Sequence, residues 1–235
     1  MPRAAHLQSL TENLTRIFDT LYIAKQISRP KRLELNQIVR NQELLKYLAT
    51  HLYGPTREVV IPGEAEAKLV LLSVREPDKR QSDLLVFQRA VPHARSKPKP
   101  LRCLIGHRFT EPVMQTFRFN IRQLFELFDI EEEYSGFDGA AVNIIDDLRD
   151  RISSCDFCLF DNRETTTPSK PNVYIEAGMA FALRRPFIFS HYKREVWPAD
   201  FSNFSYLSYT SYNDLFQKLS ALLPIFLTEK LNQQP

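Results

Sequence analysis

Residues 157–190, with the sequence FCLFDNRETTTPSKPNVYIEAGMAFALRRPFIFS, contain a strand–helix–strand pattern. Phe157–Phe160 and Pro186–Ser190 are short apolar runs, and Asn172–Leu183 between them has the composition of a helix. Parallel strands that are covered on both faces are apolar along their whole length, and a helix usually joins one to the next. The stretch therefore predicts two strands of a parallel sheet with a crossover helix between them.

The alternation continues on both sides of this stretch. Further strands are expected at Leu101–Ile105, Ile130–Tyr134 and Tyr206–Tyr209, and further helices from about residues 111, 141 and 211. Five short apolar strands alternating with helices predict an α/β domain, an open parallel five-stranded sheet with helices on both faces. Ligands of such sheets bind beyond the carboxyl ends of the strands, so we expect a site in the loops after residues 106, 134, 160 and 190.

Residues 1–91 follow a different pattern. Apolar residues at steps of three and four predict one helix over about residues 7–28, which Pro30 ends, and a second helix from Leu35 to Leu52. Short β-like runs follow at Glu58–Ile61, Lys68–Ser73 and Leu84–Gln88. We expect a small α+β domain with an N-terminal helical hairpin.

Residues 92–100 hold three prolines without regular periodicity and predict a Pro/Lys-rich linker, so the second domain is expected to span residues 101–235. Residues 1–100 carry 17 Lys and Arg against 10 Asp and Glu, and the remaining residues carry 14 against 18. No tight Lys/Arg cluster accompanies this asymmetry, which argues against a nucleic-acid partner. Three cysteines give no disulfide framework, and no apolar run is long enough to span a membrane, so a cytoplasmic protein without a membrane partner is expected.

Glu176 lies near the start of the helix expected after Pro171. Asn172 suits the N-cap position, so Glu176 falls at the fourth helical position, one later than the acid of a capping box. The helix dipole favours the ionised carboxylate, and the small Ala177 and Gly178 allow a ligand to come close. Two interpretations are open, a catalytic carboxylate and a solvated glutamate in a first turn.

Two segments carry a resemblance to a known family. One is the strand Ile152-Ser153-Ser154-Cys155-Asp156-Phe157-Cys158-Leu159-Phe160-Asp161, and the other is the helix Pro171-Asn172-Val173-Tyr174-Ile175-Glu176-Ala177-Gly178, followed by a strand that Arg185-Pro186 introduces. Residues 144–210, and more loosely 101–220, resemble the nucleoside 2-deoxyribosyltransferase-like and TIR-like group of flavodoxin-fold proteins. A helix glutamate is the catalytic residue of that group. The resemblance therefore implies that Glu176 acts on the N-glycosidic bond of a nucleotide.

The same resemblance suggests which residues hold the substrate. Gly106, His107, Arg108, Asp161 and Asn172 are the candidates, since His107 and Arg108 could contact phosphate or ribose hydroxyls and Asp161 a ribose hydroxyl or a base edge. A histidine satisfied within its loop, and an Asx-turn at Asp161, are the structural alternatives. The loop Gly106-His107-Arg108-Phe109 lacks the tyrosine that deoxyribosyltransferases usually carry there.

The resemblance does not supply an acid that protonates the departing base, Asp147 being the nearest candidate. This favours NAD(P) as the substrate, because nicotinamide leaves as a neutral base. The expected function is NAD(P) glycohydrolase-type cleavage without a cofactor or metal, in a prokaryotic defence effector. The alternatives are a nucleotide-binding sensor without turnover and a nucleoside deoxyribosyltransferase or nucleotide N-glycosidase. Residues 1–91 are expected to regulate activity or to mediate assembly, through a second copy or a regulatory partner.

Overall fold

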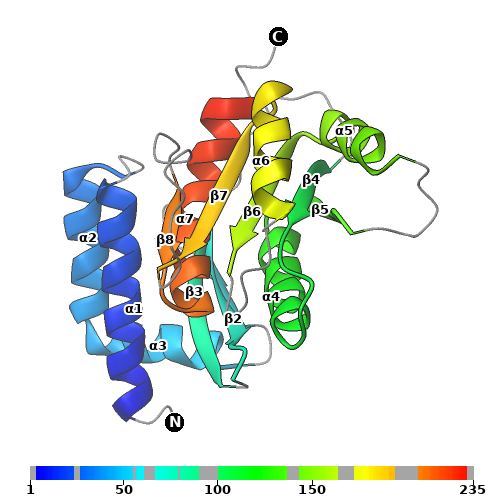
Figure 1. The fold of residues 1–235 in the computed structure, drawn as a ribbon. Helices are drawn as coiled ribbons and strands as arrows, with labels where there is room; N and C mark the ends of the chain where they lie inside the picture. The colour runs from blue at the N-terminus through cyan, green and yellow to red at the C-terminus, as the bar shows by residue number, and fades with distance from the viewer. Residues whose placement is uncertain are drawn as a thin grey trace. The chain divides into compact units, whose positions relative to one another are not determined.

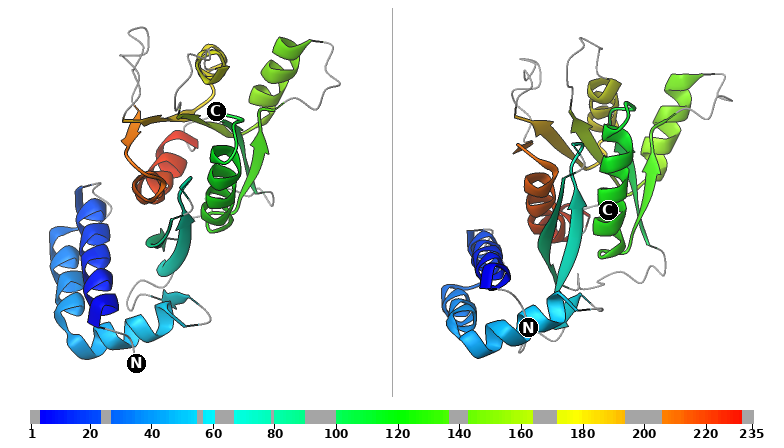
Figure 2. Two further views of the ribbon diagram at one scale, coloured as in Figure 1. Left: turned by 60° about the horizontal axis from the view of Figure 1, so that its bottom comes forward. Right: turned by 90° about the horizontal axis from the view of Figure 1, so that it is seen from below.

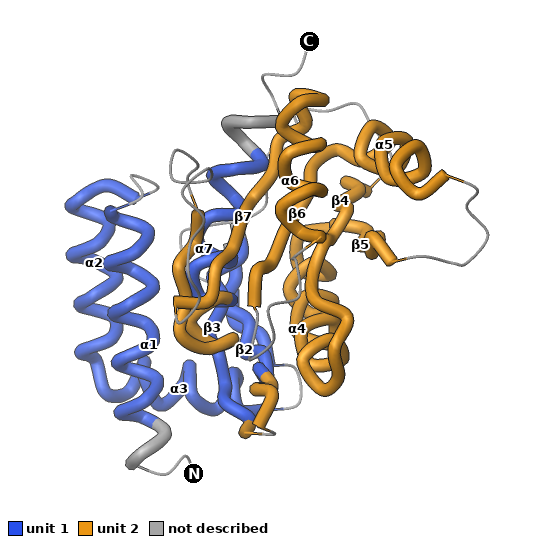
Figure 3. Tube along the Cα trace, in the orientation of Figure 1, with its two compact units in different colours: residues 1–74, 81–94, 216–235 blue, residues 75–80, 95–215 orange. Residues whose placement is uncertain are grey.

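The computed structural model describes residues 4–23, 27–54, 57–60, 67–78, 80–89, 100–136, 143–163, 172–193 and 206–231. Two compact units make up the chain (Figure 3). Unit 1 comprises residues 1–74, 81–94 and 216–235, and unit 2 comprises residues 75–80 and 95–215. Of the predicted linker at residues 92–100, only Pro100 is among the described residues.

Unit 1 combines helices with a small sheet. Its described helices are α1 (Ala4–Ile23), α2 (Arg29–Arg40) and α3 (Gln42–Leu52), and α1 and α2 lie side by side (Figure 1). The strands are β1 (Glu58–Val60), β2 (Ala67–Arg75) and β3 (Gln81–Arg89), in the order β1-β2-β3, with β1 antiparallel to β2. Leucines of all three helices and of the sheet share one apolar core, for example Leu14, Leu35, Leu52 and Leu71.

The second predicted helix of unit 1 is divided in two at Asn41. The Asn41 backbone N–H closes α2 on the carbonyls of Gln37 and Ile38, and its side-chain oxygen accepts hydrogen bonds from the first N–H groups of α3. One asparagine therefore ends one helix and begins the next, which the unbroken apolar spacing concealed. Pro30 does not end a helix, because it lies in the first turn of α2 after the N-cap Ser28.

Unit 2 has the predicted α/β architecture with one parallel sheet in the order β5-β4-β6-β7-β8. All four neighbouring strand pairs are parallel, and the strands are β4 (Leu101–Gly106), β5 (Ile130–Tyr134), β6 (Phe157–Asn162), β7 (Phe187–Tyr192) and β8 (Leu207–Tyr209). In chain order this is 2-1-3-4-5, the flavodoxin-like order. The five predicted strands and their parallel pairing are confirmed.

Helices cover both faces of this sheet. α4 (Val113–Glu126) lies on one face, and α5 (Ile144–Ser154) and α6 (Asn172–Ala182) lie on the other (Figure 2). α7 (Tyr212–Leu231) begins in unit 2, and from Phe216 onward its residues belong to unit 1. Among the described residues, no helix combines the length and the apolarity that a membrane crossing requires.

Side chains along β6 point alternately to the two faces of the sheet. Cys158 and Phe160 pack with Ile152, Val173 and other residues of α5 and α6. Phe157 points the other way and contacts Phe125 of α4 at 6.3 Å between ring centroids. Because the side-chain period of a strand is two, Asn162 continues the α6 face and Asp161 the α4 face.

Candidate functional site

The centre of the sheet contains a topological switch point between β4 and β6. The chain leaves β4 toward β5 on one side, and it leaves β6 toward β7 and β8 on the other. In doubly wound sheets this reversal opens a crevice beyond the carboxyl ends of the two strands. Gly106, the last residue of β4, pairs with Phe160 of β6. A ligand site is therefore expected around Gly106.

Glu176 of α6 fills the space directly over Gly106. Its side chain is only 6% exposed, although it comes from the first half of a helix. A Cβ atom at Gly106 would lie 1.9 Å from Glu176 Oε2 and 2.8 Å from Phe160 Cδ1. Only glycine leaves room for the carboxylate at this position. The interpretation of Glu176 as a solvated first-turn glutamate is wrong, because the side chain is buried at the switch point.

Burial raises the pKa of Glu176 to about 7, and the nearby Ser135 hydroxyl and the charge of Arg151 oppose this rise. The Ser135 hydroxyl lies near enough to Glu176 to act on its pKa, but neither Glu176 Oε2 nor Ser135 Oγ has a partner at hydrogen-bonding geometry among the described residues. Buried carboxylate oxygens are nearly always hydrogen-bonded in folded proteins. Near neutral pH the group is therefore partly protonated, and one of its oxygens is free to meet a ligand.

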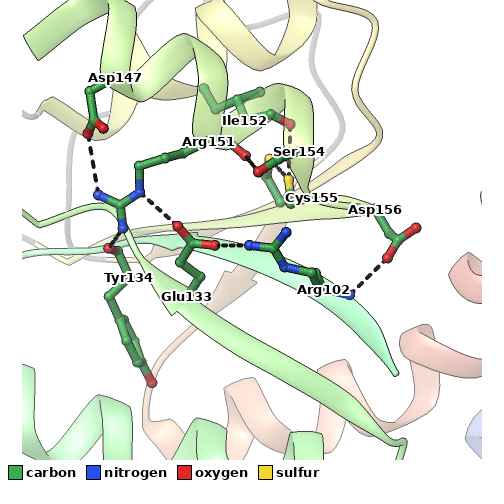
Figure 4. Close-up of polar contacts among 10 residues, drawn as sticks. Arg102, Glu133, Tyr134, Asp147, Arg151, Ile152, Ser154, Cys155 and Asp156 are labelled. Atoms are coloured by element: carbon green, nitrogen blue, oxygen red, sulfur yellow. Dashed lines mark hydrogen bonds and ion pairs between the residues drawn. The ribbon is translucent and has the colours of Figure 1, made fainter. Parts of the chain in front are cut away.

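Arg151 of α5 holds the chain segment that follows β5. Its guanidinium donates to Glu133 Oε1 at 2.8 Å and to the Tyr134 carbonyl, while Asp147 lies 3.6 Å away (Figure 4). It also donates to the Gly136 carbonyl at 3.1 Å. Ser135 lies between the two carbonyls that Arg151 binds. Arg151 thus fixes the segment that carries Ser135, and its charge acts on Glu176.

His107 uses both of its ring nitrogens inside the protein. Arg118 Nε donates to His107 Nε2 at 3.0 Å, so the proton is assigned to Nδ1, which donates to the Arg108 carbonyl at 2.6 Å. The ring is 3% exposed and packs against aromatic rings, those of Phe109, Phe117 and Tyr134. Burial lowers the pKa of His107 to about 4, helped by the charge of Arg118 and opposed by the Arg108 carbonyl. His107 is a neutral histidine of the α4 face.

Arg108 and Asn172, two further candidates, lie closer to solvent. Arg108 is half-buried, and its Nε donates to Thr110 Oγ1 at 3.0 Å. Asn172 is exposed and is the first residue of α6, whereas the sequence suggested that Asn172 is the N-cap residue just before the helix. Helix ends vary by a residue or two between assignments.

Asp161, at the end of β6, joins three strands on the face opposite Glu176. Its Oδ1 accepts from the Ser190 hydroxyl at 2.6 Å, and its Oδ2 accepts from the Tyr209 hydroxyl at 3.1 Å. Burial raises the pKa of Asp161 to about 6, against the two hydrogen bonds and the charge of Arg163, which lower it. Both oxygens have partners from β7 and β8, which is the arrangement of a structural carboxylate.

Several residues around the carboxyl edge were not singled out from the sequence. Asn162 Nδ2 donates to the Tyr174 hydroxyl at 2.7 Å and lies 3.3 Å from His191 Nδ1. Ser135 directly follows the predicted strand 130–134, so the rule on carboxyl ends pointed to its loop without naming the residue. Arg151 had no such signal, since its role depends on the tertiary position of α5.

The Cys155-x-x-Cys158 spacing brings the two thiols together, but no further metal-binding side chains join them among the described residues. The sulfur atoms are 3.6 Å apart and both residues are buried. The contact with Cys155, together with burial, raises the pKa of Cys158, and the same contact lowers the pKa of Cys155. Among the described residues, no group of three His, Cys, Asp or Glu side chains is placed to hold a metal ion.

These features define the class of the protein: a flavodoxin-like α/β domain with a buried, partly unsatisfied glutamate at its switch point. No protein-family model matches the chain, and no curated protein does. Among solved structures the chain is similar to a CMP N-glycosidase, BcmB, of Clostridium botulinum. The match has 21% identity and a TM-score of 0.35, and it covers 50% of this chain and 96% of that chain. A likeness at this level is a distant one of fold and says nothing about the ligand.

Proposed function

We propose that unit 2 cleaves the N-glycosidic bond of a nucleotide, with Glu176 as the carboxylate that meets C1′ of the ribose. The observation that carries the proposal is the unpartnered Oε2 atom of a buried glutamate, held against Gly106 at the switch point. Ligands of this sheet type bind at that crevice. A buried carboxylate oxygen without a protein partner is costly unless a ligand uses it.

The chemistry of N-glycosidic cleavage suits such a group. When the bond from C1′ to the base nitrogen breaks, its electron pair leaves with the base, and C1′ becomes an oxocarbenium-like cation. A carboxylate stabilises this cation or bonds to it, and a water oxygen then attaches to C1′. The water proton passes to solvent or to Glu176. A pKa of about 7 allows Glu176 to be ionised for the first step and to accept a proton afterwards.

The carboxylic acids of the described residues favour a substrate whose base leaves without protonation. Asp161 has both oxygens engaged by Ser190 and Tyr209, and Asp147 faces Arg151. Neither is placed to protonate a departing base. Nicotinamide leaves NAD(P) as a neutral molecule, because its glycosidic nitrogen is already cationic. The positively charged nicotinamide ring of NAD(P) near Glu176 would lower the pKa of Glu176 and so favour the ionised carboxylate. NAD(P) is therefore the first substrate class to test.

The proposed setting is that of a prokaryotic defence effector, as the family resemblance implies. An enzyme that consumes NAD harms its own cell unless it is held inactive, and residues 1–91 are the proposed regulatory or assembly part. A second function is favoured by the raised pKa of Glu176 itself. A protonated, buried carboxyl donates a hydrogen bond, so the same crevice would suit a sensor that retains a nucleotide without turnover.

The test is incubation of the full chain with NAD, NADP, deoxynucleosides and nucleoside monophosphates, followed by chromatography of the products. Release of a free base by the wild type and its loss in Glu176→Gln supports the proposal. Glu126→Gln, at an exposed position of α4, is the matched control and should keep full activity. Tight binding of a nucleotide that is recovered intact would favour the sensor. A base released equally by Glu176→Gln would rule out the assigned role.

A further inference from the structure

Arg163 is a buried cation at the carboxyl end of β6. It directly follows the last residue of that strand and is only 9% exposed. Its guanidinium carbon lies 4.6 Å from the ring centroid of Tyr192 and 4.3 Å from that of Tyr212. Tyr192 ends β7 and Tyr212 begins α7. Side chains from three elements therefore meet at this guanidinium.

Two of the hydrogen-bonding atoms of Arg163 lack protein partners. Nε and Nη1 are buried and have no hydrogen-bond acceptor among the described residues. The charge of Asp161 acts on Arg163, but the two oxygens of Asp161 accept from Ser190 and Tyr209. No salt bridge joins Asp161 to Arg163 within the described part of the chain. An unsatisfied buried guanidinium is destabilising, so its presence calls for an acceptor from elsewhere.

The surroundings keep Arg163 charged. Burial alone would lower its pKa, but Tyr212, Tyr209, Asp161 and Tyr192 together outweigh burial and raise the pKa above its ordinary value. Cation–π attraction to the rings of Tyr192 and Tyr212 holds the guanidinium in place. A planar fork of fixed donors matches the oxygens of a phosphate group.

We propose that Arg163 binds the phosphate group of a phosphorylated ligand at the carboxyl end of β6. The place is the edge of the sheet at which ligands of this fold bind, but on the face opposite Glu176. Two sources share this chemistry. The phosphate belongs either to the nucleotide that Glu176 cleaves, an assignment that rests on the proposed function, or to a separate phosphorylated ligand.

Thermal unfolding of the full chain tests the phosphate contact without any turnover. Inorganic phosphate is compared with sodium chloride at equal ionic strength. At ten times the dissociation constant, phosphate should multiply the folding equilibrium constant about 11-fold and raise the transition temperature by roughly 3–5 °C. Arg163→Met should abolish the rise. Arg122→Met, which removes an exposed arginine paired with Glu132, should keep it. No rise in the wild type, or an equal rise in Arg163→Met, would overturn the proposal.

Arg163→Lys is a second variant, which tests the proposal even if Arg163→Met does not fold. It keeps the charge but replaces the planar fork by a point donor, so phosphate should bind at least about threefold more weakly. Undiminished binding by this variant would also overturn the proposal. Glu176→Gln should keep the full phosphate response, which separates this test from the proposed function. Competition between inorganic phosphate and NAD, with a raised KM in Arg163→Lys, would assign the phosphate to the substrate. An unchanged KM would assign it to a separate ligand.

Discussion

The carboxyl edge of the parallel sheet carries two buried carboxylic acids, one on each face. Glu176 lies on the α6 face and Asp161 on the opposite face, and they are 6% and 2% exposed. Burial raises both pKa values, to about 7 and about 6. The two groups differ in their partners. Both Asp161 oxygens accept hydrogen bonds, whereas Glu176 Oε2 has no partner among the described residues.

This difference shows that burial and a raised pKa do not by themselves identify a reactive group. Asp161 has donors on the neighbouring strand β7 and on the next strand β8, so its carboxylate connects β6 with both. Glu176 projects from a helix onto Gly106, which has no side chain to act as a partner. The candidate for chemistry is the group that the protein leaves unsatisfied, since a structural acid would have acquired partners.

The largest expected effect separates the two acids by activity. Glu176→Gln should lower the turnover of NAD by at least about 1000-fold, because the amide cannot stabilise a cation at C1′ as a carboxylate does. Initial rates of nicotinamide release measure the effect, and circular dichroism checks the fold. Glu126→Gln should leave the rate unchanged. A Glu176→Gln enzyme within tenfold of the wild type would remove the distinction between the two carboxylates.

Stability should respond in opposite directions at the two positions. The folded-state pKa of Glu176 is raised, so its contribution to stability is present below its unfolded pKa and is lost as the pH rises through about 7. At about pH 8, Glu176→Gln should therefore stabilise the protein by roughly 2–3 kcal/mol, and at about pH 4 by little. Asp161→Leu should destabilise it by about 2–4 kcal/mol, because Tyr209 loses its acceptor and Arg163 loses the charge of Asp161. Urea unfolding at the two pH values measures both effects, and equal signs at pH 8 would contradict the comparison.

Glycine 106 offers a third test, of the space that Glu176 occupies. Gly106→Ala places a methyl group where Glu176 Oε2 and Phe160 Cδ1 now lie, so overpacking should cost about 1–3 kcal/mol of stability. The cost should shrink in the double variant with Glu176→Ala, because the two positions are in contact. Gly178→Ala is the matched control, since a Cβ atom there meets nothing within 4 Å and a helix favours alanine. Equal costs for the two glycines would show that the close approach is unimportant.

Fold and site differ in how far the sequence could predict them. The strands of unit 2 follow from apolar runs such as Phe157–Phe160, because strands buried on both faces need apolar side chains throughout. Glu176 was singled out because it has no capping role in its helix and because it matches the helix glutamate of the family that the sequence resembles; its catalytic role stays a prediction. Ser135 and Arg151 were missed, because their relation to Glu176 arises only when β5, α5 and α6 pack together. His107 was expected to contact a ligand, but Arg118 on the next helix uses its free nitrogen, which no local spacing reveals.

The smallest expected effect is the pH dependence of the reaction, and it separates the two acids most directly. If the ionised form of Glu176 is required, kcat/KM for NAD should rise with pH around a midpoint of about 7, by about tenfold between pH 6 and pH 8. A requirement for ionised Asp161 would instead place the midpoint at about 6, and the pKa of His107, about 4, lies too low to contribute in this range. NAD is the suitable substrate because its phosphates are diesters that do not titrate near neutral pH. Initial rates at low NAD concentration in buffers of constant ionic strength give the profile, because kcat/KM reports groups of the free enzyme. A midpoint near 6, or a profile that is flat over this range, would show that the activity does not depend on the ionisation of Glu176.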